Sequence, residues 1–418
     1  MKTIRYFQSL QRACFTLIFI LLLNVCNLRA QSPQEFQNML EEINADSLRQ
    51  TVLDLQNFGS RFALREGGNI EVAEYIVDRL NRYGVTAVVD SFYESGTNWL
   101  CGDYAQWFYN VRGVLAADHP VDDSIVILGA HFDAIALPPD HSMVLQQTPG
   151  ADDNASGVAV LLEIARIYHQ HHYVPRRDIH FMAYDGEELG LFGGVHDAWK
   201  RQYEQDKIVV MLNNDMVSYQ PTDDWKLTLH WYDNALDLTA KAAEICEEYT
   251  DIQPVIPAEA ENGNARSSDS YAYYMYGFRP VFAIEYYFST SYHTDHDVVD
   301  SNNYAYHSHV TRYNLAMLRE FAGNNEESSI VEAARETVRV YPNPVENVAM
   351  VQFSLNQSSK IDISVMDLAG RCMKQWLSRD CAAGVNYVEM DFSDLPAGVY
   401  FCQFRGKQQN FVKKIVVR

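Results

Sequence analysis

Apolar residues follow two different patterns in the first part of the chain. In residues 32–83 they recur every three or four positions in two stretches, and Tyr83-Gly84 ends the second stretch. The segments 85–92 and 107–116 are instead rich in β-branched and aromatic residues. These patterns predict two amphipathic helices followed by two strands.

Strand and helix patterns alternate from residue 124 onwards. Apolar runs typical of buried strands lie at 124–129, 178–184, 208–215 and 281–286, and helical spacing appears at 155–168 and 303–321. Such alternation is typical of a parallel sheet with helices on both faces. The sequence therefore predicts a three-layer α/β/α sandwich with a mixed, largely parallel central sheet.

The composition changes after Gly323. A polar segment at 326–337 is interpreted as a linker between a first domain at 31–325 and a second domain at 338–418. The second domain shows short alternating strand patterns, separated by turn signals at 341–344, 367–371 and 395–401. Short strands with regular turns predict a small C-terminal β-sandwich.

The first 30 residues have the pattern of a secretory signal peptide. Lys2, Arg5 and Arg12 precede an apolar run at 15–25, which is followed by Leu28-Arg29-Ala30. A membrane anchor is the alternative, but the run is shorter than the roughly 20 residues needed to span a bilayer. We expect an exported protein with no stable membrane span.

The formal net charge is −22, and most of the negative charge lies between residues 31 and 334. An acidic surface argues against nucleic acid or an anionic membrane as a partner. Five cysteines follow the leader: Cys101, Cys246, Cys372, Cys381 and Cys402. They are too few for a disulfide framework. Cys372 and Cys381 are the expected pair if they flank one hairpin.

Candidate metal ligands follow the predicted strands. They are His131 in Gly-Ala-His-Phe-Asp, Asp153 in Gly-Ala-Asp-Asp-Asn-Ala-Ser-Gly, Glu187 and Glu188 in Asp-Gly-Glu-Glu, Asp215 in Asn-Asp-Met, and His293 in Tyr-His-Thr-Asp. Each motif alone fits an ordinary strand end or helix cap. Together, two imidazoles and three carboxylates suit a pair of Zn²⁺ ions and leave one carboxylate to move protons.

The motifs suggest how the ligands divide between two ions. Asp153 is the natural bridge, because small residues on both sides let its loop bend tightly. We expect His131 and Asp215 to complete one ion's ligands, and Glu188 and His293 the other's. Glu187 then accepts a proton from water. We further expect Asp133 to accept the second imidazole N–H of His131, and Asp297 that of His293.

The other histidines are weaker candidates for metal binding, and two common hydrolase motifs are absent. His296 lies near the position expected for the last metal ligand, but His293 is the preferred candidate. His169, His171 and His172 lie at a helix end. His307 and His309 are expected on the surface of the last helix. The chain has no His-Glu-x-x-His and no Gly-x-Ser-x-Gly, which excludes the corresponding zinc and serine hydrolase designs.

These motifs, with Arg61-Phe62 and the segment 73–76, resemble the M28 family of zinc aminopeptidases over about residues 35–322. The resemblance implies an α/β/α fold and two co-catalytic zinc ions, with Asp153 as bridge and Glu187 as general base. It implies a cis peptide bond between Asp153 and Asn154. In some members a tyrosine before the last ligand steadies the oxyanion, and Tyr292 holds that place.

Two other functions are compatible with this scaffold. The Asp185-Gly-Glu-Glu188 motif is also similar to that of glutaminyl cyclases, which use a single zinc to form pyroglutamate, whereas 153–157 resembles the peptidase loop. A non-catalytic binding protein would have lost ligands, and none is lost here. We expect a secreted two-zinc aminopeptidase acting on peptide N-termini, with a specificity pocket built from 217–232 and 255–270.

The C-terminal domain resembles the sorting domain of the type IX secretion system. The similarity rests on Tyr341-Pro-Asn-Pro344, the turn at 367–371, the segment 395–400 and the basic end of the chain. It implies export through the periplasm to the medium or the cell surface, with the type IX machinery as a partner. The alternative is a β module that binds carbohydrate or another surface.

Overall fold

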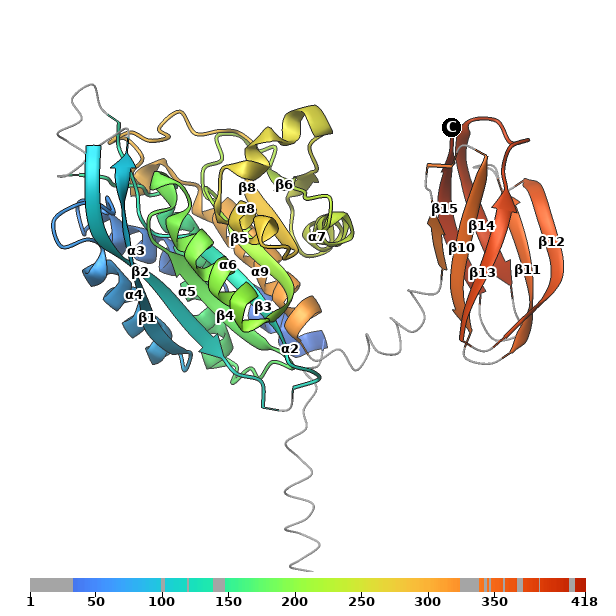
Figure 1. Cartoon of the computed structure of the whole chain (residues 1–418), viewed down its shortest axis with the longest axis horizontal. Helices are drawn as coiled ribbons and strands as arrows, with labels where there is room; N and C mark the ends of the chain where they lie inside the picture. Colours follow the sequence, from blue (N-terminus) through green and yellow to red (C-terminus); the bar gives the residue numbers. More distant parts are fainter. Residues whose placement is uncertain are drawn as a thin grey trace, which may run out of the picture. The chain divides into compact units, whose positions relative to one another are not determined.

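The computed structural model describes residues 33–98, 102–118, 120–137, 147–323, 338–341, 344–345, 347–355, 358–366, 371–382, 384–405 and 410–418. The chain divides into two compact units, one within 1–324 and one within 325–418 (Figure 1). The predicted signal peptide, the linker, the turn at 367–370 and Cys101 lie outside the described residues. Within the described ranges, no helix is both long and apolar enough to cross a membrane.

The described part of the first unit, from Pro33, starts with three helices, α2 (Pro33–Glu41), α3 (Ala45–Gln56) and α4 (Ile70–Arg82). The prediction of two helices is therefore wrong. Asn44 separates the first two, because its side chain accepts the backbone N–H groups of Asp46 and Ser47 and caps a new helix. Apolar spacing continues across this break, so the pattern alone does not reveal it.

An eight-stranded sheet forms the centre of the first unit. Its strands are β1 (Thr86–Asn98), β2 (Gly102–Leu115), β3 (Ser124–His131), β4 (Asp178–Tyr184), β5 (Lys207–Asn214), β6 (Lys226–His230), β7 (Gln253–Val255) and β8 (Pro280–Glu285). They lie in the order β1-β2-β4-β3-β5-β8-β6-β7. The central strands β4, β3, β5 and β8 are parallel, and β1 and β2 form an antiparallel hairpin at one edge.

Helices cover both faces of this sheet (Figure 1). Further helices are α5 (Ala155–Gln170), α6 (Phe192–Glu204), α7 (Leu236–Tyr249), α8 (Asp269–Met275) and α9 (Tyr304–Ala322), with short 3₁₀ helices η3 (Glu187–Leu189), η4 (Glu259–Arg266) and η5 (Val299–Ser301). In β3, Val126 and Leu128 pack with the core of α5 and α9, whereas Ile125 and Ile127 pack with α6 and α8. The predicted three-layer α/β/α fold is confirmed.

The second unit consists of two antiparallel sheets. Their strands are β9 (Val338–Tyr341), β10 (Val348–Leu355), β11 (Ser359–Met366), β12 (Cys372–Cys381), β13 (Gly384–Asp391), β14 (Gly398–Arg405) and β15 (Asn410–Val417). The orders are β13-β10-β9 and β12-β11-β14-β15, around one shared core. In the segment 395–400, the Tyr400 hydroxyl donates to the carbonyl of Pro396 at 2.7 Å and closes the turn before β14.

The expected disulfide between Cys372 and Cys381 is wrong. Both cysteines are free, and they lie at opposite ends of the single strand β12. Ten strand residues span roughly 30 Å, far more than the approximately 7 Å limit between the Cα atoms of a disulfide. The two cysteines flank a strand, not a turn.

Burial also changes the picture for two histidines. His307 is fully buried in α9, where its Nε2 lies 3.0 Å from the carbonyl oxygen of Ser156, so its predicted place on the surface is wrong. His180 is buried in β4, and its Nδ1 lies 3.1 Å from Nη2 of Arg201. The guanidinium can only donate, so His180 accepts through Nδ1 and is neutral.

We expect His180 to destabilise the first unit in acid. Burial, with the charges of Arg201 and Arg112, lowers its pKa to about 3, whereas an unfolded histidine titrates near 6.5. The unfolded state therefore binds the proton first, and stability falls by up to about 1.4 kcal/mol per unit as the pH drops from about 6.5 to 3. Urea denaturation of His180→Gln with chelator present should show a shallower decline than wild type.

A matched control is His169→Gln, at the exposed end of α5. This variant should follow the wild-type pH dependence. If His180→Gln and wild type lose the same free energy of unfolding between pH 6.5 and 4, His180 does not drive the acid sensitivity.

Candidate metal centre

The candidate ligands meet at the carboxyl ends of the parallel central strands. His131 is the last residue of β3, and Asp215 directly follows β5. Glu187 and Glu188 lie in η3 just after β4, and His293 lies in the loop after β8. Asp153 immediately precedes the N-cap residue of α5. Loops at the carboxyl ends of parallel strands are where open α/β sheets place their sites.

The carboxylate of Asp153 lies between the two histidines. Its Oδ1 is 3.3 Å from Nε2 of His131, and its Oδ2 is 3.1 Å from Nε2 of His293. Each imidazole faces one more carboxylate: Asp215 lies 3.2 Å from His131, and Glu188 lies 2.9 Å from His293. The side chains thus form two clusters of three potential ligands that share Asp153.

Both clusters fit a tetrahedral zinc ion. Zinc bonds of 2.0–2.1 Å place neighbouring ligand atoms about 3.3 Å apart, and the separations here are 2.9–3.3 Å. Each Nε2 faces two carboxylate oxygens, and one N–H group cannot serve both well. In addition, Nε2 of His293 and Oε1 of Glu188 are buried without a hydrogen-bond partner. A cation held between the facing nitrogen and carboxylate oxygens would give Nε2 of His293 the partner it lacks.

Burial and charge shift the protonation of these groups strongly. Burial lowers the pKa of His131, but the Glu187 and Asp215 carboxylates outweigh it and raise that pKa well above its ordinary value. Burial raises the pKa of Glu187 well above its usual range and that of Glu188 to about 7. So many buried acids need positive charge beside them, and divalent cations supply it.

The loop around Asp153 depends on close backbone packing. The peptide bond between Asp153 and Asn154 is cis, as the family resemblance implies. The Asn154 side chain caps α5 by accepting the N–H of Gly157 at 2.9 Å, and it is fully buried. A Cβ atom on Gly157 would lie 2.5 Å from the carbonyl oxygen of Asn214. This position therefore requires glycine.

Of the two supporting carboxylates, only Asp133 lies beside the expected imidazole. Nδ1 of His131 lies 3.2 Å from the carbonyl oxygen of Asp133 and 3.5 Å from its Oδ1, and the carboxylate also accepts the backbone N–H groups of Glu187 and Glu188 at 3.0 and 3.3 Å. Asp297 does not orient His293; its oxygens accept the N–H groups of Asp152 and Asp153 at 2.9 and 3.0 Å. Both therefore hold the loops that carry ligands.

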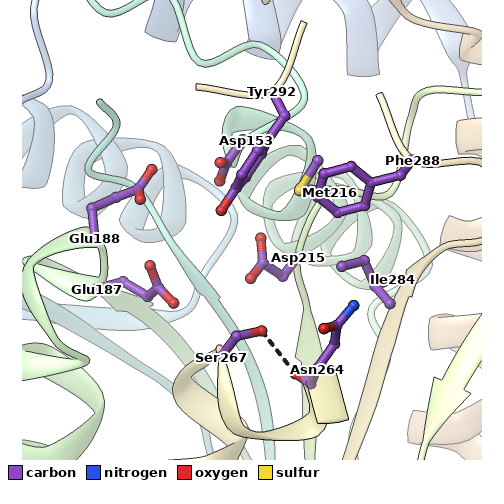
Figure 2. A pocket seen from close by; sticks show the side chains of 10 residues that line it. All are labelled: Asp153, Glu187, Glu188, Asp215, Met216, Asn264, Ser267, Ile284, Phe288 and Tyr292. Atoms are coloured by element: carbon purple, nitrogen blue, oxygen red, sulfur yellow. Dashed lines mark hydrogen bonds between the residues drawn. The ribbon is translucent and has the colours of Figure 1, made fainter. Parts of the chain in front are cut away.

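A pocket of about 170 Å³ opens beside the two clusters (Figure 2). It is lined by Asp153, Glu187, Glu188, Asp215, Met216, Asn264, Ser267, Ile284, Phe288 and Tyr292. Tyr292 stacks on His293 with ring centroids 3.6 Å apart, and its hydroxyl points into the space between Glu188 and Asp215. Burial, with the nearby carboxylates, raises its pKa, so this hydroxyl keeps its proton.

The pocket wall was only partly predictable. The expected segment 255–270 supplies Asn264 and Ser267, but 217–232 contributes none of the lining residues. Ser268 and Asp269 are fully buried at the start of α8 and do not line the pocket. The apolar side comes instead from Met216, Ile284 and Phe288, which adjoin Asp215 and β8. Their position next to ligand-bearing strand ends is the signal that could have found them.

Comparison with known proteins gives two family matches. The sequence model of Peptidase family M28 matches residues 110–318, and that of the Secretion system C-terminal sorting domain matches 339–418. An uncharacterized protein of Escherichia coli, YfbL, is 37% identical over 116 residues, which cover 28% of this chain and 34% of that protein. A probable zinc metalloprotease of Pyrenophora tritici-repentis is 29% identical over 204 residues, covering 46% and 45%. The matches thus span less than half of these relatives.

Solved structures share the fold at low sequence identity. An aminopeptidase from Aneurinibacillus sp. strain AM-1 is 15% identical with a TM-score of 0.58, covering 70% of this chain and 97% of that chain. A glutaminyl cyclase of Bacteroides thetaiotaomicron is 19% identical with a TM-score of 0.54, covering 68% and 99%. At this identity the likeness shows the architecture alone, and the two differ in activity.

Proposed function

The chain belongs to peptidase family M28 and carries a C-terminal secretion sorting domain; from this premise we propose that it is a secreted aminopeptidase with two zinc ions, removing N-terminal residues from peptides. One observation carries the proposal. The two oxygens of Asp153 face different imidazoles, and each imidazole faces a carboxylate of its own. Such a shared carboxylate suits a pair of ions about 3.5–4 Å apart.

Each ligand has a defined place in this proposal. His131 and Asp215 would hold one zinc ion, Glu188 and His293 would hold the other, and Asp153 would serve both, since these side chains form the two clusters that share it. Bound zinc ions lower the pKa of water and polarise a peptide carbonyl. The chain's own residues position the substrate and move the protons.

Glu187 is the proposed general base. It lines the pocket but belongs to neither ligand cluster, and its Oε2 lies 4.0 Å from Nε2 of His131. Asp133 accepts its backbone N–H at 3.0 Å and fixes the start of η3. Glu187 accepts the proton of the attacking water and delivers it to the leaving amine. The Tyr292 hydroxyl, which stays protonated, donates to the oxyanion on the carbonyl carbon.

The shape of the pocket favours a free amine and an apolar first side chain. Acidic side chains form one side of it and attract the positive α-amino group. Met216, Ile284 and Phe288 lie on the other side and offer an apolar contact for the first residue. We therefore propose that peptides starting with a medium-sized apolar residue are the preferred substrates.

A glutaminyl cyclase with a single zinc is the second candidate. The loop Asp185-Gly-Glu-Glu188 and the overall architecture are compatible with it. Against it stands the second cluster, in which Nε2 of His131 lies 3.2 Å from Asp215 and 3.3 Å from Oδ1 of Asp153. A one-zinc enzyme has no need of these additional ligands.

The sorting domain bears on where the protein acts. Its match over residues 339–418 indicates a protein that is secreted or held at the cell surface. We propose that the leader directs the chain to the periplasm, and that the type IX machinery then recognises the C-terminal domain. Peptides outside the cell are then the substrates.

Mass spectrometry of defined peptides tests the function. The purified protein is incubated with a Leu-initiated peptide, its Gln-initiated counterpart and the N-acetylated Leu peptide, with and without a chelator. We expect chelator-sensitive loss of the whole first residue, faster for Leu than for Gln, and no reaction of the acetylated peptide. Loss of ammonia alone from the Gln peptide indicates a cyclase, and three unchanged peptides indicate a binding protein.

A further inference from the structure

Arg61 is a fully buried arginine in the segment between α3 and α4, upstream of the residues matched by the family. Its guanidinium donates three hydrogen bonds: Nε to the carbonyl of Phe132 at 2.8 Å, Nη1 to that of Pro149 at 2.7 Å and Nη2 to that of Gly150 at 2.7 Å. These acceptors are neutral carbonyl oxygens. A buried charge with such partners is costly to maintain, which calls for a reason beyond packing.

The acceptors lie next to His131 at the end of β3 and in the loop that carries Asp153. Phe132 directly follows His131, and Gly150 lies three residues before Asp153. The backbone of Arg61 joins the same loops: its N–H donates to Oγ1 of Thr148 at 2.6 Å, and its carbonyl accepts the N–H of Ala134 at 3.2 Å. Arg61 therefore ties the end of β3 to the loop before α5 through both side chain and backbone.

The hydrogen bond from Nη2 of Arg61 to the carbonyl of Gly150 brings the guanidinium close to the Gly150 backbone. Gly150 has φ +45°, and a Cβ atom there would lie 2.7 Å from Nη2 of Arg61 and 2.4 Å from the carbonyl oxygen of Asp153. The guanidinium thus occupies the space that a side chain at position 150 would fill. The conformation of the loop at Gly150 and the position of the Arg61 side chain therefore depend on each other.

Asn69 connects a third ligand-bearing loop to the backbone of Arg61. Nδ2 of Asn69 donates to the carbonyl of Arg61 at 2.7 Å and to Oδ1 of Asp185 at 2.9 Å. Asp185 opens the motif that contains Glu187 and Glu188. The short segment from Arg61 to Asn69 therefore contacts the segments that carry three of the five candidate ligands, His131, Asp153 and Glu188.

Three carboxylates near the metal centre also act on the charge of Arg61. The carboxylates of Asp297, Asp133 and Asp153 favour its positive form through space, against the effect of burial, which lowers its pKa to about 10.

We infer that Arg61 is a positioning residue for the metal centre: it fixes His131 relative to Asp153 and so sets the affinity for zinc. This inference rests on the proposed function, because it assumes that these residues hold zinc. Arg61 bonds to the backbone beside the ligands and not to the ligands themselves. For scale, removing an outer hydrogen-bond partner of a metal ligand typically weakens metal binding about 10- to 100-fold.

The test compares two buried arginines. Arg201 is 2% exposed and binds Asp197 and Asp206, and it touches none of the candidate ligands. Arg61→Met, Arg61→Lys, Arg201→Met and Arg201→Lys are made in the full chain. Zinc affinity is measured by competition with a chromogenic chelator, and the melting temperature of each metal-free protein is recorded.

We expect Arg61→Met to weaken zinc binding about 10- to 100-fold. The zinc affinity of Arg61→Lys should lie between that of Arg61→Met and wild type, because lysine keeps the positive charge but cannot donate the same three hydrogen bonds. The Arg201 variants should lower the melting temperature and keep wild-type zinc affinity. If a variant does not fold, its lysine counterpart decides.

Wild-type zinc affinity in folded Arg61→Met and Arg61→Lys would overturn the inference. Equal weakening in the Arg61 and Arg201 variants would overturn it too, since it would reflect general destabilisation. A wild-type protein that binds no zinc has a separate meaning, because it removes the proposed zinc function itself.

Discussion

Glu187→Gln is expected to lower kcat by about 10²- to 10⁴-fold while the zinc content stays at the wild-type value. Glutamine has the size of glutamate but cannot accept the proton of the attacking water. Because Glu187 lies outside both ligand clusters, its replacement should leave the metal ions in place. Initial rates on a Leu-initiated peptide, with zinc measured by mass spectrometry on the same sample, check both parts.

The control is Glu204→Gln at the exposed end of α6, which should behave as wild type. An equal fall in kcat and in kcat/KM would place the effect in the transition state. A variant that keeps full activity removes Glu187 from the chemistry. A variant that loses one zinc ion would instead make Glu187 a ligand.

Asp153→Asn should empty the centre of at least one zinc ion. An amide presents one oxygen, so it cannot offer an acceptor to both His131 and His293, which the two carboxylate oxygens now face. It also removes a negative charge from between the two clusters. We expect one zinc ion or none per chain, and a loss of activity larger than the roughly 10- to 100-fold typical of an outer-sphere change.

Asp223→Asn, on an exposed part of the loop before β6, is the matched control and should keep the wild-type zinc content and rate. Two tightly bound ions in Asp153→Asn would rule out the bridging role. A single ion in the wild-type protein would favour the cyclase alternative over the aminopeptidase.

The sequence predicts most of the fold, and the candidate ligands it proposes lie close together in the structure. Motifs such as those of His131 and Asp215 follow apolar runs typical of buried strands, and parallel strands bring their carboxyl ends to the same side of the sheet. Local spacing is enough to find such residues. It also separates the acidic, catalytic first unit from the short strands of the second.

Other features were harder to predict. Asn44 divides one apolar pattern into two helices by a local cap, and Cys372 and Cys381 lie along a strand instead of around a turn. The roles of Asp297 and Arg61 are set by partners more than 80 positions away, Asp153 and Pro149, and no local pattern encodes such a distance.

The candidate ligands come from five separate segments between residues 131 and 293, and neither cluster can form within one of them. A chain that has not yet completed its sheet therefore has no metal centre. Under the proposed function, peptide cleavage is then a late product of folding, because it requires both the finished sheet and bound metal.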